Sequence, residues 1–505
     1  MSSPRYGDLV VVDETFEAAM AASHVPGAVW GVVLDGELAH VGTVGTSSID
    51  DGARPPDEHT LFRIASMTKS FTAATLMILR DDGGLGLDDP VATHVPELAG
   101  LRGPTTDSPT ITLRHLLSMN AGVATDDAWA DRQLDASAAE LDRYFADGQT
   151  FAVAPGTAFE YSNLGYAMLG RVIANVTGLA FQRVITERII EPLGLSDTVW
   201  VPEARHHDVA TGHRLVDGVP TVDGAPLGDG GFAAMGGLWS TIADLARWMT
   251  FFADAFPARD DADDGPLCRA TRREMQQVWR STPLKIVPVG DDGWLRAGPV
   301  GYGAGLDVFD HLRLGPMAGH SGGLPGFGSH MRWCIERPLA IVALGNITYA
   351  PMGRTVRDAF DALVLTDRAN ALAPRRVVAV SAALTEAAAG LVALLDEWDD
   401  ARAGALFEDN VDLDDSFVRR AAAARTLRER VGAMTLDRIE ATSAAAATAF
   451  VRAERGEITI LFDLSPRRPP RIQFYEVTEP DPDREPEPEP AAADELAVDV
   501  GSIDR

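Results

Sequence analysis

The sequence predicts an α+β fold in which a helical block is inserted between two groups of strands that form one sheet. Two apolar runs near the start are joined at Asp35-Gly36, and this dipeptide between apolar runs is typical of a β-hairpin. A helix-rich stretch follows, and then apolar and alternating runs return. Strands from both ends of a domain can pair in a single sheet. The predicted strands are residues 29–34, 38–44, 303–309, 328–335 and 339–344.

Apolar spacing and end signals predict the helices between these strands. Thr112 is expected to be an N-cap, because its hydroxyl can accept a backbone N–H of the following turn, and Ser240 or Thr241 is expected to cap a later helix. Gly83-Gly84 ends another helix, since glycine is a poor helix former. The predicted helices are residues 13–23, 69–80, 113–119, 164–176, 180–190 and 242–252.

The length of 505 residues exceeds what one hydrophobic core usually spans, so we expect more than one domain. A break near Ala373-Pro374 divides the chain, and beyond it two helical patterns precede three β-like runs. That order resembles the cone-shaped ketosteroid-isomerase type of domain. The last stretch, with ten acids against two arginines among prolines, is typical of a disordered tail. The predicted units are a main domain over residues 1–372, a small α+β domain over 373–478 (helices 380–397 and 415–431, strands 447–454, 457–462 and 471–477) and a tail over 479–505.

Composition limits the classes of partner. A net charge of −30 opposes binding to nucleic acid or to an anionic membrane surface, which would repel the protein. The only cysteines, Cys268 and Cys334, could form at most one bridge, which fits a reducing compartment. The first residues lack a basic start with an apolar run, and no stretch of about 18 apolar residues occurs. We therefore expect a cytoplasmic protein without a nucleic-acid or membrane partner.

The four residues Ser66-Met67-Thr68-Lys69 are the sharpest chemical pattern. On a helix, positions three apart share a face, so Lys69 would lie beside the Ser66 hydroxyl. A serine needs an adjacent base to become a nucleophile, and a lysine desolvated in a cleft can accept its proton. Lys69 and Lys285 are the only lysines, so this spacing rarely arises by chance. The alternative is an ordinary lysine on a surface helix.

Tyr161-Ser162-Asn163 lies at the predicted turn before the helix over 164–176. A tyrosine near a cationic lysine can be held closer to its phenolate form, and an asparagine offers both a donor and an acceptor. Both could converge with Ser66 on one site. Alone, the triplet is a weak signal, because a turn tyrosine followed by a capping asparagine is the commoner explanation.

The pentapeptide Gly-His-Ser-Gly-Gly at residues 319–323 suggests a rival nucleophile. It matches Gly-x-Ser-x-Gly, the strand-to-helix turn of α/β-hydrolases, and would assign that role to Ser321. Residues 324–328 oppose this, because their proline and glycines cannot begin the required helix. A triad also needs an acid and then a histidine downstream, whereas the only later histidine is His330 and no acid lies between.

In this order the three patterns resemble the signature of the serine β-lactamase-related family. Its members include class C β-lactamases, D-alanyl-D-alanine carboxypeptidases, D-aminopeptidases and carboxylesterases. The resemblance covers about residues 10–365 and is highly specific in combination. The motifs are Phe62 to Lys69, Tyr161-Ser162-Asn163 and His320-Ser321-Gly322, and the similar connecting stretches are residues 87–90, 111–117, 236–240 and 322–330.

The resemblance implies a β-lactamase/penicillin-binding-protein-like fold, with a mostly antiparallel sheet flanked by helices and a helical insert. It also implies that Ser66 is the acyl acceptor and that Lys69 and Tyr161 share the acid and base roles. The backbone N–H groups of Ser66 and Gly323 would form the oxyanion hole, with the third motif on a sheet-edge strand. The residues assigned to substrate binding are Asn163, a ligand of both lysine and substrate, with His320, Ser321, Gly322 and Gly323.

One position departs from the family. The lactamase and carboxypeptidase branches usually have a lysine where this chain has His320, and its fixed charge attracts the substrate carboxylate. A histidine is largely neutral at pH 7 unless a neighbour raises its pKa. Carboxylate recognition is therefore weakened, and esters or amides of less acidic substrates become more plausible.

No cofactor is expected, and the case for a metal is weak. His206-His207-Asp208 and His213 could be called a ligand cluster, but adjacent histidines in a strand or loop point apart. No helical His-x-x-x-His accompanies them. A polar surface loop explains them better.

The sequence thus predicts a serine hydrolase with a Ser66 acyl-enzyme, an esterase or amidase for a small ester, amide or short peptide. Alternatives within enzymes are a D-aminopeptidase and a D,D-peptidase or β-lactamase-like activity. A non-catalytic binding protein with a retained cleft is the alternative from another class. Selectivity is expected in the loops over 126–147 and 208–231. Nothing in the sequence indicates an oligomeric state.

Overall fold

The computed structural model describes residues 9–203, 208–224, 227–283, 286–289, 294–297 and 299–479. It divides into two compact units, Met1–Arg376 and Val377–Arg505. The division lies close to the sequence break at Ala373-Pro374. The segment predicted to be an acidic tail falls almost entirely outside the described residues.

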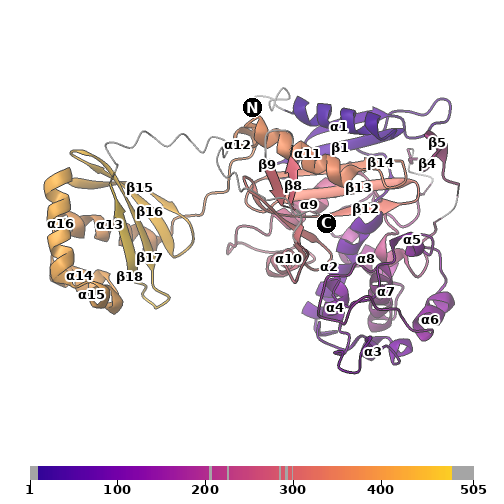
Figure 1. Ribbon diagram of the computed structural model, residues 1–505, viewed down its shortest axis with the longest axis horizontal. Helices are drawn as coiled ribbons and strands as arrows, with labels where there is room; N and C mark the ends of the chain where they lie inside the picture. The colour runs from indigo at the N-terminus through magenta and orange to yellow at the C-terminus, as the bar shows by residue number, and fades with distance from the viewer. Residues whose placement is uncertain are drawn as a thin grey trace, which may run out of the picture. The chain divides into compact units, whose positions relative to one another are not determined.

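An eight-stranded antiparallel sheet forms the centre of the first unit (Figure 1). Its strands come from both ends of the unit, because β1 pairs with β14 from Ala28 opposite Gly345 to Leu34 opposite Leu339. The predicted strand–helix–strand order is therefore confirmed. In sheet order the strands are β2 (Glu37–Gly45), β1 (Gly27–Leu34), β14 (Leu339–Gly345), β13 (Phe327–Cys334), β12 (Gly315–Leu324), β11 (Asp307–His311), β10 (Pro299–Tyr302) and β7 (Arg280–Ser281).

Helices cover both faces of this sheet. On one face α1 (Val10–Ala22) and α11 (Met352–Leu365) pack together, and Phe16 of α1 stacks on Trp30 of β1 with ring centroids 4.7 Å apart. On the other face α9 (Ile242–Ala253) contacts the central strands. The apolar character of β1 and β14 along their whole length follows, because strands buried on both faces need apolar residues at successive positions.

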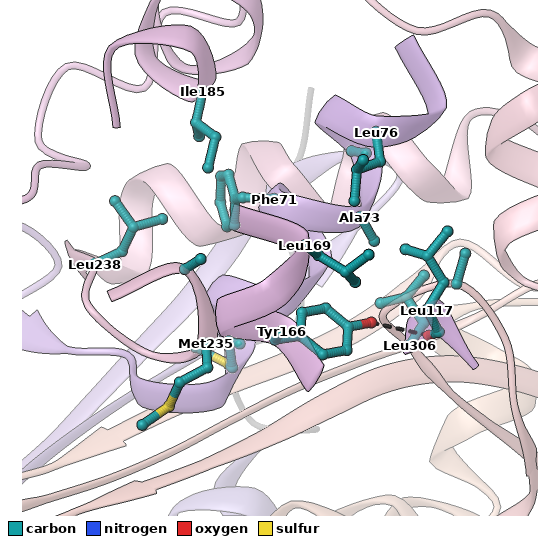
Figure 2. Close-up of a cluster of buried hydrophobic side chains, with 14 of the residues drawn as sticks. Phe71, Ala73, Leu76, Leu117, Tyr166, Leu169, Ile185, Met235, Leu238 and Leu306 are labelled. Carbon is teal, nitrogen blue, oxygen red and sulfur yellow. Dashed lines mark hydrogen bonds between the residues drawn. The ribbon is translucent and has the colours of Figure 1, made fainter. Parts of the chain in front are cut away.

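The inserted helical block packs against α2 (Thr68–Asp81) through α7 (Asn163–Thr177). Figure 2 shows this core, in which Phe71 of α2 lies near Leu169 of α7 and the Tyr166 hydroxyl donates to the carbonyl of Leu117 over 2.9 Å. Such packing holds the starts of α2 and α7 in fixed relation. The other helices of the unit are α3 (Val91–His94), α4 (Leu113–Leu117), α5 (Asp127–Ala130), α6 (Ala138–Ala146), α8 (Phe181–Ile185) with a π-helical turn (Thr186–Ile190), α10 (Arg269–Met275) and α12 (Arg368–Leu372).

Two predicted caps are present, and one predicted strand is wrong in its first half. Thr112 accepts the N–H of His115 at the start of α4, and Thr241, rather than Ser240, accepts the N–H of Asp244 at the start of α9. The strand predicted over 303–309 begins only at Asp307, because the preceding residues turn the chain from β10 into β11. The small two-stranded sheets are β3 (Phe62–Arg63) with β6 (Trp239–Ser240), β4 (His213–Val216) with β5 (Val219–Val222), and β8 (Ile286–Val289) with β9 (Trp294–Ala297).

The second unit has its own core between helices and a four-stranded antiparallel sheet. The structure adds two short helices and one strand to those predicted. The added strand, β15, is an edge strand whose apolar alternation is interrupted by a register shift between Leu436 and Arg438, so it leaves a weak periodic signal. The elements are α13 (Ala382–Asp396), α14 (Asp400–Leu406), α15 (Asp409–Asp414), α16 (Phe417–Val431), β15 (Met434–Ala441), β16 (Ala446–Ala453), β17 (Gly456–Leu464) and β18 (Ile472–Thr478).

Among the described residues, no single helix is long and apolar enough to cross a membrane. Only α7 and the segment Phe181–Ile190 pass such a test as a pair, and they are bent by 81° relative to each other. Most of α7 is buried in the core of the first unit.

Candidate active site

Ser66 lies in a 3-10 turn, Ala65–Met67, directly before α2. Ala65 has a φ of +49°, in the left-handed region that residues other than glycine rarely adopt. The strand β12 passes so close to this turn that a Cβ on Gly322 would overlap the carbonyl oxygen of Ile64. A glycine is therefore required at that position for the strand to approach the Ser66 turn.

Lys69 is the buried partner of Ser66. None of its surface is exposed, and its Nζ lies 2.8 Å from Ser66 Oγ, 2.7 Å from Asn163 Oδ1 and 2.8 Å from the carbonyl oxygen of Met235. Burial lowers the pKa of Lys69 to about 7, against the opposing effect of nearby carboxylates, chiefly that of Asp127. The amide and carbonyl oxygens can only accept hydrogen bonds, so in the neutral amine the lone pair is left to face Ser66.

Tyr161 completes the contact with the nucleophile. Its hydroxyl is hydrogen-bonded to Ser66, and Lys69 Nζ lies 5.0 Å from the centroid of its ring. Burial raises the pKa of Tyr161 well above its ordinary value. The expectation that the lysine would favour the phenolate form is therefore wrong, because desolvation of the phenolate outweighs the charge beside it. Tyr161 is a neutral phenol at this site.

Asn163 is held at the first turn of α7. Ser162 caps that helix by accepting the N–H of Gly165, and Asp126 accepts the N–H groups of Asn163 at 2.7 Å and Leu164 at 2.8 Å. The Asn163 side chain donates from Nδ2 to Asp127 Oδ1 at 2.7 Å while its Oδ1 accepts from Lys69. Its amide orientation is thus determined by both neighbours.

His320 begins the third motif, on β12, and is neutral. The Tyr302 hydroxyl lies 2.9 Å from His320 Nε2, and His320 Nδ1 contacts the carbonyl oxygen of Ser321, so the ring donates from Nδ1 and accepts at Nε2. Burial, with the charge of Lys69 as a lesser cause, lowers the pKa of His320 to about 3. This position therefore carries no positive charge at neutral pH.

The family resemblance implies that the third motif lies on an edge strand of the sheet, and the structure differs at this point. β12 is an internal strand of the sheet, but β11 pairs only with its first half, from Gly315 to Gly319. The second half, which holds Gly322 and Gly323, pairs with β13 on one side. Among the described residues it has no strand partner on the other side. The motif thus faces the site from an open half-edge.

These groups surround one cavity of about 410 Å³. Ser66, Tyr161 and His320 line it, as do Ser321, Gly322 and Gly323. Lys69 and Asn163 lie behind the wall, in contact with Ser66 and with each other. The structure therefore brings all eight residues predicted from the sequence to one place.

The rival nucleophile lacks the setting it would need. Ser321 lies within β12, which runs through a tight turn into β13, so no helix follows it. Its Oγ lies 2.8 Å from His330 Nδ1. His330 Nε2 is buried and has no hydrogen-bond partner among the described residues, so the acid that orients the histidine in a triad is missing. The α/β-hydrolase interpretation is wrong for the fold that surrounds Ser321.

Four carboxylates at or near the cavity were not predicted. Asp127 and Asp307 line it, Asp126 caps α7, and Asp131 accepts from the hydroxyl of Tyr349, which also lines the cavity. Burial raises the pKa of Asp307 to about 7 and that of Asp131 to about 6. Three of the four come from the loop region expected to control selectivity, but no motif distinguished them from other acidic residues.

The histidines considered as metal ligands do not form a centre in the described part of the chain. His213 Nδ1 lies 2.9 Å from the carbonyl oxygen of Asn346, and its Nε2 accepts the N–H of Ile49 at 3.4 Å, so both ring nitrogens are used within the fold. His206 and His207 lie outside the described residues. Among the residues that are described, no group of three potential ligands could hold a metal ion.

This fold and this site define a serine hydrolase in which a buried lysine adjoins the nucleophile. A family model described as Beta-lactamase matches residues 12–366, and the chain belongs to that family. The match covers nearly the whole region in which the motif resemblance was found, about residues 10–365.

Two named relatives are similar to part of this chain. "Protein flp" of Staphylococcus aureus (strain N315) is 30% identical over 194 residues, which are 37% of this chain and 37% of that protein. "Penicillin-binding protein 4" of Amycolatopsis lactamdurans is 33% identical over 202 residues, which are 40% of this chain and 51% of that protein. The chain thus aligns with well under two thirds of either relative.

The structure of the octameric penicillin-binding protein homologue from Pyrococcus abyssi covers 93% of this chain and 96% of its own, with a TM-score of 0.60 and 21% identity. At that identity it shows a shared fold. The aligned part, 93% of this chain, is longer than the first unit, so the shared fold extends into the second unit.

Proposed function

We propose that this chain hydrolyses small esters or amides through an acyl-enzyme on Ser66. The observation that carries the proposal is the contact between Ser66 Oγ and the buried Lys69 Nζ at 2.8 Å. An amine with a pKa of about 7 is half neutral at neutral pH, so it can take the serine proton without a large penalty.

The steps follow from the protonation states. Neutral Lys69 accepts the proton of Ser66 as Oγ attacks the substrate carbonyl. Ser66 and Gly323 both line the cavity, and in this mechanism their backbone N–H groups stabilise the oxyanion. Tyr161, which keeps its proton, donates to the leaving group and is reprotonated from Lys69. Water then attacks the acyl carbonyl while Lys69 takes a proton from it, and as the ester bond to Oγ breaks Lys69 returns that proton to Ser66, which frees the acid product.

Neutral His320 supports an ester or amide over an anionic β-lactam or a peptide with a terminal carboxylate. A fixed positive charge at this position would attract a carboxylate, and burial removes it here. A D,D-peptidase or β-lactamase-like activity remains the alternative, and its support is the family and the name of the relative "Penicillin-binding protein 4".

The test is turnover of 4-nitrophenyl esters by the wild type and by Ser66→Ala. The expected result is a burst of 4-nitrophenol matching the enzyme concentration, an acyl adduct on Ser66 by mass spectrometry, and loss of both in the variant. A fluorescent penicillin and a fluorophosphonate probe are compared on the same samples. Unchanged hydrolysis by Ser66→Ala would refute the assignment, and failure of every acylating probe to label the wild type would favour a non-catalytic binding protein.

A further inference from the structure

Asp307 lies where the open half of β12 begins. It is the first residue of β11 and pairs with Gly319, the last residue of β12 that has a partner on that side. Asp307 also lines the cavity that holds Ser66 and Tyr161, and its charge acts on the Tyr161 hydroxyl. None of the motifs that identify the family includes this carboxylate, and the acyl-transfer steps do not use it.

The carboxylate of Asp307 has no partner within the described protein. No hydrogen bond or ion pair joins it to another described residue, and Arg332 is the cation whose charge lowers its pKa. Arg332 pairs with Gly319 from the opposite side of β12, so two strand spacings, about 10 Å, separate the two backbones. The Arg332 guanidinium lies 3.7 Å from the ring centroid of Phe309, two residues beyond Asp307.

Among the residues that the structure describes, the rest of the cavity wall adds negative charge and no exposed cation. Asp127 lines the cavity, with its Oδ1 already accepting from Asn163. Lys69 is fully buried behind Ser66. The third-motif position, where related enzymes use a lysine, holds the neutral His320. An anionic substrate would therefore meet repulsion, whereas a cation would pair with a carboxylate that has no partner among the described residues.

We propose that Asp307 selects substrates that carry a positively charged group, an ammonium or a guanidinium, near the scissile bond. This inference rests on the proposed function and names the substrate class of the same site. An unpaired carboxylate in a partly buried wall is costly, and a substrate cation removes that cost when it binds. The raised pKa of Asp307, about 7, is the corresponding sign of desolvation.

The test compares two esters of equal shape and different charge. They are the 4-nitrophenyl esters of 4-(trimethylammonio)butanoate and of its uncharged carbon isostere, 5,5-dimethylhexanoate. For the wild type we expect kcat/KM to favour the cationic ester, and in Asp307→Asn we expect the ratio of the two values to fall by roughly 10- to 100-fold. The quaternary nitrogen cannot lose its charge, so the comparison is free of substrate titration.

Asp310→Asn is the matched control. Asp310 lies on the same strand, is exposed and is not part of the cavity wall, so its loss changes the net charge equally. The control should keep the wild-type ratio, and thermal melts of both variants check the fold. Wild-type hydrolysis of both esters without a charge preference would overturn this inference and leave the proposed function intact.

Two further outcomes are decisive. An equal loss of both esters in Asp307→Asn would assign the residue to the acyl-transfer steps and overturn its role in selection. Full hydrolysis of both esters by Ser66→Ala would instead refute the proposed function itself. The two failures are therefore distinguishable in one set of assays.

Discussion

Lys69 Nζ lies 2.8 Å from Ser66 Oγ, and no part of the lysine side chain reaches solvent. Its remaining contacts, Asn163 Oδ1 and the carbonyl oxygen of Met235, are acceptors without charge. Burial among neutral acceptors disfavours the ammonium form, whereas Asp127 and Asp126 favour it. In the proposed mechanism, the balance between burial and these carboxylates sets the pH above which Lys69 can act as the base.

The pH dependence of kcat/KM should therefore rise through about pH 7. The pKa of Lys69 is lowered from 10.5 to about 7, so the amine is protonated below that pH and neutral above it. Only the neutral amine can accept the serine proton, so log kcat/KM for a 4-nitrophenyl ester should climb with a slope near one and then level off. A profile that is flat from about pH 5 to pH 9 would contradict Lys69 as the base.

Asn163→Asp should shift this profile to higher pH. The new carboxylate would accept from Lys69 and stabilise its ammonium form, so we expect the pKa of the acidic limb to rise by roughly one to three units. It would also face Asp127, which now accepts from Asn163 Nδ2. Asn175→Asp, on the exposed part of the same helix, is the control and should leave the limb in place. An unshifted limb in Asn163→Asp would show that another group titrates.

Substitution of the two cavity serines should separate the two possible nucleophiles. Ser66→Ala should lose at least about 10³-fold in kcat, since it removes the acyl acceptor. Ser321→Ala removes only a hydroxyl that contacts His330, so we expect a loss of less than about tenfold. Labelling by a fluorophosphonate should persist in Ser321→Ala and vanish in Ser66→Ala. The reverse pattern of labelling would reinstate the Gly-x-Ser-x-Gly interpretation.

Gly322→Ala should damage both stability and catalysis. Its methyl group would overlap the carbonyl oxygen of Ile64 and the hydroxyl of Ser329, which pushes β12 away from the turn that carries Ser66. We expect a loss of about 1–3 kcal/mol in the free energy of unfolding and about 10²-fold in kcat/KM, because small displacements at a reacting centre are costly. Denaturant melts and ester assays measure both effects. Gly100→Ala, where an added Cβ meets no atom within 4 Å, should change neither.

Local geometry explains why the central motif could be predicted. The contact between Ser66 and Lys69 follows from their separation by one helical turn, which a sequence displays directly. The convergence with Tyr161 and β12 is a long-range relation. Residue chemistry alone offers it only as one option for Tyr161, and the family resemblance is what predicts the whole arrangement. The position of Asp307 depends on where β11 stops pairing with β12, and no local pattern encodes that end.

Besides long-range contacts, the sequence does not reveal how deeply each side chain is buried. The sequence indicates that the cationic Lys69 lies near Tyr161, which predicts a lowered pKa for the phenol. Burial of the phenol instead raises its pKa. The sequence likewise predicts strand over residues 303–306, where the chain turns before β11. Gly305 there has a φ of +71°, and an added Cβ would lie 2.7 Å from the carbonyl oxygen of Lys69, so the glycine lets the turn pack on α2.

The unpaired half of β12 affects the range of substrates that the site can bind. An extended peptide bound along it would form main-chain hydrogen bonds that are the same for every amino acid. Binding would therefore require no particular side chain. Preference among extended ligands would then depend on the few side chains that line the cavity beside this strand. Substitution of one such side chain would change which substrates bind, without altering the residues that carry out the hydrolysis.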